Sequence, residues 1–116
     1  MRKLDWDESG SLENWQRAVL EFARRAREEL GDHIVRIILY GSRARGDYTE
    51  DSDIDILVVV RDIDAKEADE RLSWLAWEVL EDYNELFSVR VVREDEYAVK
   101  RGSSYYINVN EEGVAV

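Results

Sequence analysis

Two short apolar runs on either side of one polar loop most constrain the fold of this chain. Residues 34–40 and 53–60 are rich in β-branched side chains, a pattern typical of β-strands. The second run is almost wholly apolar after its opening Asp53-Ile54-Asp55, which predicts a strand buried on both faces. Two carboxylates at the start of such a strand repel each other, so a compensating positive charge is expected near them.

Two amphipathic helices are predicted around these strands. The first runs from an N-cap at Ser11, without a full capping box, to a stop at Gly31, and the second runs from a cap at Asp64 to about Asn84. Apolar residues recur in both at spacings of three and four, which gives each helix one buried face. These positions are Leu12, Trp15, Val19, Phe22, Ala26 and Leu30 in the first, and Ala68, Leu72, Leu75, Val79 and Leu80 in the second.

The rest of the chain contributes a third strand and short elements. Predicted are a strand over 86–92, short helices over 94–100 and 103–112, and a tail strand over 114–116. This order gives an α+β fold, a two-layer arrangement in which a small mixed sheet of three or four strands carries its helices mainly on one face. We expect residues 1–10 to be a loose lead-in and residues 11–116 to form a single domain.

The charge of the chain limits its partners. Its 116 residues carry a formal net charge of −11, which repels a nucleic-acid backbone, so no nucleic acid binding is expected. The absence of cysteine excludes disulfides and thiolate metal sites and fits a reducing compartment. The first residues lack the apolar stretch of a signal peptide, and no apolar run is long enough to span a bilayer. We therefore expect a cytoplasmic protein without membrane contact, and the sequence leaves a homo-oligomer open.

The polar loop and the aspartates suit a metal-bound polyphosphate. Side chains two apart in a strand project from one face, so Asp53 and Asp55 are predicted to point together. Their hard oxygen atoms suit Mg²⁺, which completes its coordination with phosphate oxygens and water. Gly41 lets the backbone approach a ligand closely, and Ser42 with the following N–H groups can cradle a phosphate.

Each half of this pattern also has a plain structural explanation. Gly-Ser at a strand end is often only a turn, and aspartates commonly guard strand ends. The two halves together, with Arg43 or Arg45 available for a charge-assisted contact to phosphate, favour a binding site.

The motif resembles that of a known superfamily. Gly41-Ser42, ten intervening residues and Asp53-Ile54-Asp55 resemble the signature of the DNA polymerase β nucleotidyltransferase superfamily. The longer stretch YGSRARGDYTEDSDIDILVV resembles the minimal nucleotidyltransferases of the antitoxin (MntA-like) type, which are partners of HEPN-domain toxins. The small size, the long first helix and the closing INVNEEGVAV resemble the same group.

The resemblance implies a function and roles for the motif residues. It implies a polymerase β-like sheet and transfer of AMP from ATP to a hydroxyl, which in related antitoxins is a tyrosine of the toxin. Asp53 and Asp55 would be catalytic and hold Mg²⁺. The nucleotide-binding residues would be Gly41, Ser42, Arg43 and Arg45.

The chain departs from the superfamily in one respect. Many members place a third carboxylate on the next strand, whereas the positions here that could face the site hold Ser88 and Arg90. Loss of such a base typically lowers a rate by about 10²–10⁴. The alternative is therefore a catalytically weak nucleotide-binding module that neutralises a HEPN-type partner by direct binding.

Two aromatic pairs have no assigned role. Trp74 and Trp77 lie partly off the apolar face of the second helix; we favour core packing over an exposed partner interface. Tyr105 and Tyr106 stay open between tail packing and stacking on adenine.

Overall fold

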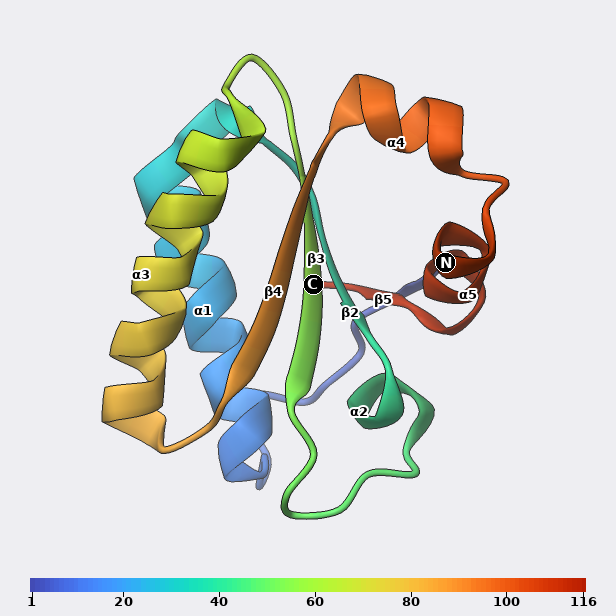
Figure 1. The fold of residues 1–116 in the computed structure, drawn as a ribbon. Helices are drawn as coiled ribbons and strands as arrows, with labels where there is room; N and C mark the ends of the chain where they lie inside the picture. Colours follow the sequence, from blue (N-terminus) through green and yellow to red (C-terminus); the bar gives the residue numbers. More distant parts are fainter.

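The structure is a computed structural model that describes residues 1–116 as one mixed sheet with helices on both faces (Figure 1). The strands are β1 (Arg2–Lys3), β2 (Ile34–Tyr40), β3 (Ile54–Val60), β4 (Phe87–Arg93) and β5 (Val114–Ala115). The helices are α1 (Asn14–Leu30), η1 (Gly31–His33, a 3-10 turn), α2 (Ser42–Arg45), α3 (Ala65–Tyr83), α4 (Glu94–Lys100) and α5 (Ser104–Glu112). The predicted α+β class is confirmed, although the sheet has five strands rather than three or four, in the order β1-β5-β2-β3-β4.

Strand β3 is buried on both faces, as its composition predicts. It runs antiparallel to β2 and parallel to β4. Ile54, Ile56 and Val58 face the main core of 19 buried residues, which α1 and α3 cover. Leu57 and Val59 face a smaller cluster with Val109 of α5. Figure 1 shows α1 and α3 together on one side of the sheet and α4 and α5 on the other.

The first helix begins later than predicted. It starts at Asn14 with Glu13 as N-cap, so Ser11 and Leu12 lie outside it. The backbone N–H of Glu13 donates to Gln16 Oε1 at 2.8 Å, and the Glu13 carboxylate accepts from the Trp15 indole N–H and the Tyr48 hydroxyl. The helix start is thus fixed partly by Tyr48, a distant loop residue that local periodicity does not reveal.

The first residues are attached to the sheet rather than loose. Strand β1 pairs in parallel with β5, and the Leu4 N–H donates to the Ala115 carbonyl at 3.0 Å. The Trp6 ring packs edge-on against Trp15 with centroids 5.3 Å apart. These residues were expected to be loose because their partner strand lies more than 100 residues away in sequence, and local pattern does not indicate such a pairing.

The two tryptophans of α3 lie on the surface, so the core packing favoured for them is wrong. Trp74 is 62% exposed and Trp77 is 50% exposed, and their rings stack with centroids 5.3 Å apart. The inward face of α3 consists of Ala68, Leu72, Leu75 and Val79. These four residues recur at the 3.6-residue period of a helix and form the whole buried face, so the indoles of Trp74 and Trp77 lie outside that face.

No helix of the chain combines the length and apolar character needed to cross a bilayer.

Candidate active site

A row of three side chains crosses the sheet near the start of β3. Asp55 pairs in register with Tyr40 of β2 and with Ser88 of β4. Residues directly opposite in neighbouring strands project from the same face, and here it is the face that α4 and α5 cover. The residue of β4 that lies beside Asp55 is therefore Ser88, which carries a hydroxyl group and not a third carboxylate.

The structure brings Asp53 and Asp55 close enough to influence each other. Asp53 is exposed and immediately precedes β3, whereas Asp55 is half-buried inside the strand. Burial raises the pKa of the Asp55 carboxyl, and the negative charge of Asp53 raises it further. The bare pair is thus electrostatically unfavourable, and a bound cation would relieve it.

Gly41 is placed directly against Asp55. Its φ of +77° lies in the left-handed region, and a Cβ added there would lie 2.2 Å from Asp55 Oδ2. Only glycine fits such a position without strain. Ser42 follows as the first residue of α2 and is partly buried. The Gly-Ser turn therefore lies directly against Asp55 in the folded chain.

Arg45 lies beside this turn but is paired with acids. Its Nη1 lies 3.0 Å from Glu112 Oε2 and its Nε lies 3.2 Å from Asp47 Oδ2. These hydrogen bonds, to Glu112 first, raise the pKa of Arg45. The backbone N–H of Gly41 donates to Glu112 Oε1 at 3.0 Å. Glu112 was not among the predicted site residues, although it immediately precedes Gly113 and the tail strand.

Arg43 is not brought to the aspartates. Its side chain is only 4% exposed, and its guanidinium carbon lies 5.1 Å from the Trp15 ring centroid and 4.4 Å from that of Tyr48. Nη2 donates to the Ser52 carbonyl at 3.1 Å and lies 4.0 Å from Glu85 Oε1. Arg43 therefore ties the loop to α1 instead of facing the site.

Replacing Arg43 by methionine is expected to destabilise the fold by about 1–3 kcal/mol. The variant loses both ring contacts and the hydrogen bond to Ser52, and it leaves Glu85 without its cation, although removal of a buried charge offsets part of the loss. Urea unfolding measures this. The matched control is Arg45→Met, which breaks exposed ion pairs and should cost less than about 1 kcal/mol. A stable Arg43→Met variant that fails to bind ATP would restore Arg43 as a nucleotide contact.

The donor set fits a cation that is shared with a ligand. No group of three or more His, Cys, Asp or Glu side chains in the chain is arranged to hold a metal ion. A pair of carboxylates is enough protein ligation for Mg²⁺, because substrate phosphates commonly provide further ligands of this ion. Asp53 and Asp55 would hold it, and a polyphosphate would supply further oxygens.

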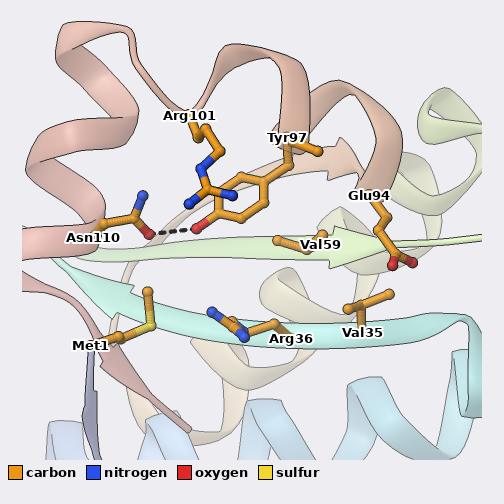
Figure 2. A pocket seen from close by; sticks show the side chains of 9 residues that line it. Met1, Val35, Arg36, Val59, Glu94, Tyr97, Arg101 and Asn110 are labelled. Atoms are coloured by element: carbon orange, nitrogen blue, oxygen red, sulfur yellow. Dashed lines mark hydrogen bonds between the residues drawn. The ribbon is translucent and has the colours of Figure 1, made fainter.

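A separate cavity of about 530 Å³ lies farther along the same sheet face. Figure 2 shows Val59 and Val35 forming its floor, with Arg36 and Arg101 beside it and Tyr97 hydrogen-bonded to Asn110. None of the motif residues lines it. Residues of α4 and α5 contribute to its lining, and the Tyr97–Asn110 contact joins these two helices.

The fold and the paired aspartates beside a Gly-Ser turn define a domain of the nucleotidyl-transferring class. The chain belongs to the nucleotidyltransferase domain family, whose model matches residues 20–104. It is 38% identical over 100 residues to "Putative protein adenylyltransferase MJ0604" of Methanocaldococcus jannaschii, covering 86% of this chain and 95% of that protein. A second relative in that organism, "Putative protein adenylyltransferase MJ0141", is 44% identical over 45 residues, which cover 39% of this chain and 46% of the relative.

Solved structures share the fold. A mutant of the MntA-HpeT toxin-antitoxin is similar with a TM-score of 0.55 and 17% identity, covering 90% of this chain and 72% of that one. A toxin-antitoxin crystallised with AMP-PNP is similar with a TM-score of 0.52 and 22% identity, covering 82% and 69%. At these identities the likeness shows the fold, and the chain is a nucleotidyltransferase domain on the strength of its sequence family.

Proposed function

We propose that this chain is a cytoplasmic, Mg²⁺-dependent enzyme that transfers AMP from ATP to a tyrosine hydroxyl of a HEPN-type toxin and thereby acts as its antitoxin. The observation that carries the proposal is the contact between Gly41 and Asp55, where a Cβ would lie 2.2 Å from the carboxylate. This close approach holds the loop backbone, with its N–H donors, against the acids that would bind the cation of a nucleotide.

The residues of the chain divide the work of the reaction. Asp53 and Asp55 would hold Mg²⁺, which when bound offsets the negative charge of the triphosphate. The Gly41 N–H and Ser42 would hold the β- and γ-phosphates, with Arg45 offsetting charge on the leaving group. The acceptor oxygen forms a bond to the α-phosphorus, the bond from that phosphorus to the bridging oxygen breaks, and pyrophosphate leaves with the electron pair. The hydroxyl proton passes to solvent.

A protein acceptor is supported by the surface and by the relatives. The relatives named as protein adenylyltransferases and the toxin–antitoxin structures point to a protein partner. The stacked Trp74–Trp77 pair on α3 offers an exposed aromatic surface of the kind that partner interfaces use. The net charge of −11 favours a basic partner.

The direct test is binding of ATP followed by analysis of the partner. Calorimetry should detect ATP binding in the presence of Mg²⁺ and none or much less in EDTA. A HEPN-type partner protein that is co-expressed with this chain should gain the mass of one or more AMP units on a tyrosine. Absence of ATP binding with Mg²⁺ present contradicts the proposal.

Ser88 favours the second candidate, a weakly catalytic module that blocks its partner by binding. The strand position beside Asp55 carries a hydroxyl instead of a carboxylate, so no general base is supplied there. Neutralisation of the partner that survives the double substitution Asp53→Asn, Asp55→Asn supports this candidate. Neutralisation that is lost together with the added mass supports the enzyme.

A further inference from the structure

The carboxylate of Glu112 occupies the donors that the proposed function assigns to phosphate. Its Oε1 accepts from the Gly41 backbone N–H at 3.0 Å, and its Oε2 lies 3.0 Å from Arg45 Nη1. The Glu112 side chain is 22% exposed, so it is packed into the turn but open to water on one side. One internal anion thus engages the Gly-Ser turn and its exposed arginine at once.

The backbone that carries Glu112 is firmly held. The next residue, Gly113, packs so closely that a Cβ there would lie 2.3 Å from the Val109 carbonyl oxygen and 2.8 Å from Ile38 Cγ2. Strand β5 then pairs with β2. Helix α5 is joined to α4 through Asn110 and Tyr97 (Figure 2), and to β2 through the Tyr105 and Tyr40 hydroxyls at 2.8 Å. Glu112 can therefore leave the turn by side-chain rotation, without movement of the helix.

Glu112 and a phosphate cannot share these donors. The Gly41 amide has a single hydrogen to donate, and two anions close together repel strongly in a partly buried site. Glu112 approaches from the donor side of the turn and joins no three-residue metal cluster with the aspartates. Its position therefore differs from that of a third metal-binding carboxylate.

We propose that Glu112 is an internal competitor of the nucleotide, and this inference rests on the proposed function. It satisfies the Gly41 amide and Arg45 in the free protein and rotates out when the phosphates of ATP take its place. Nucleotide affinity is reduced by the fraction of molecules in which Glu112 fills the turn. The residue thereby selects ligands whose charge and bound cation are sufficient to displace it.

Calorimetry of ATP with Mg²⁺ tests this on three proteins. Glu112→Gln keeps the size of the side chain but removes its charge, so ATP should bind at least about tenfold more tightly, equivalent to about 1.4 kcal/mol. The matched control is Glu111→Gln, an exposed neighbour with the same change of net charge, and its affinity should equal that of the wild type. Equal affinity of Glu112→Gln and wild type overturns the competitor role alone. Weaker binding or a large fall in turnover by Glu112→Gln also overturns it and makes Glu112 a ligand or base.

A second measurement uses the unaltered chain. On addition of ATP and Mg²⁺, the ¹³C signal of the Glu112 carboxylate should move to the position of a water-exposed glutamate, while the Gly41 amide signal shifts to a new hydrogen-bonded position. Nucleotide binding without movement of the Glu112 signal overturns the inference and leaves the proposed function standing. Failure of all three proteins to bind ATP overturns both.

Discussion

Replacing Asp55 by asparagine is expected to lower the proposed transfer of AMP by about 10³-fold or more, while making the metal-free protein more resistant to heat. The loss of activity follows from the loss of one of two carboxylates in the proposed cation site. Stabilisation of transition-state charge by a metal contributes several kcal/mol, and about 4 kcal/mol corresponds to about 10³-fold in rate. Transfer is measured by the mass added to the partner protein per unit time.

The gain in stability follows from the pKa of Asp55, which burial and then the charge of Asp53 raise above its ordinary value. The folded state therefore keeps this proton to a higher pH than the unfolded chain does. Stability contributed by Asp55 is present below the unfolded pKa and is lost as pH rises through the folded pKa. The penalty is fully present above the folded pKa of Asp55, and asparagine removes it.

Thermal unfolding in EDTA at neutral pH and at about pH 3 measures this effect. Asp55→Asn should unfold at a higher temperature than the wild type at neutral pH, with the difference shrinking as the pH falls. Asp51→Asn is the matched control because Asp51 is an exposed acid of the same loop; it should change neither activity nor the pH dependence. A less stable Asp55→Asn protein would contradict the electrostatic account of this site.

Gly41→Ala is expected to destabilise the fold by about 2–4 kcal/mol and to abolish ATP binding. The residue has a φ of +77°, and the added methyl group would lie 2.2 Å from Asp55 Oδ2. Either the turn or the carboxylate must shift, so the phosphate donors and the proposed cation ligand can no longer meet. Urea unfolding and calorimetry with ATP and Mg²⁺ measure the two effects.

Gly46→Ala separates backbone strain from the collision with Asp55. Gly46 also has a positive φ, of +92°, but a Cβ there would meet no atom within 4 Å. This control should lose about 1–2 kcal/mol from strain alone and should still bind ATP. If both alanine variants behave alike, the close approach of Gly41 to Asp55 has no special role.

Local pattern was sufficient for the central strands and for much of the candidate site. The β-branched runs predicted β2 and β3, and the near absence of polar residues after Asp55 predicted burial on both faces. The Gly-Ser turn and the two aspartates were placed together because both lie at the ends of neighbouring strands. These features depend on residues close in sequence, so periodicity and spacing report them directly.

Several features that escaped prediction depend on residues far apart in sequence. Arg43 and Arg45 are the same residue type in the same loop, so the sequence does not distinguish their roles. In the folded chain Arg43 is buried against Trp15 and Tyr48, whereas Arg45 lies beside the turn and pairs with Glu112. Arg2 and Lys3, which were expected to be loose, form a strand because β5 lies beside them at the edge of the sheet.

By itself, the sequence determined the class of fold, the family and the residues at which chemistry is expected, because strand periodicity and the spacing of Gly41, Ser42, Asp53 and Asp55 are local properties. Only the tertiary structure decided which charges face the site. Glu112 reaches the Gly41 amide across 71 residues of chain. The packing of α5 and β5 on β2 sets this contact. Local sequence patterns do not reveal which distant segments meet in the folded chain.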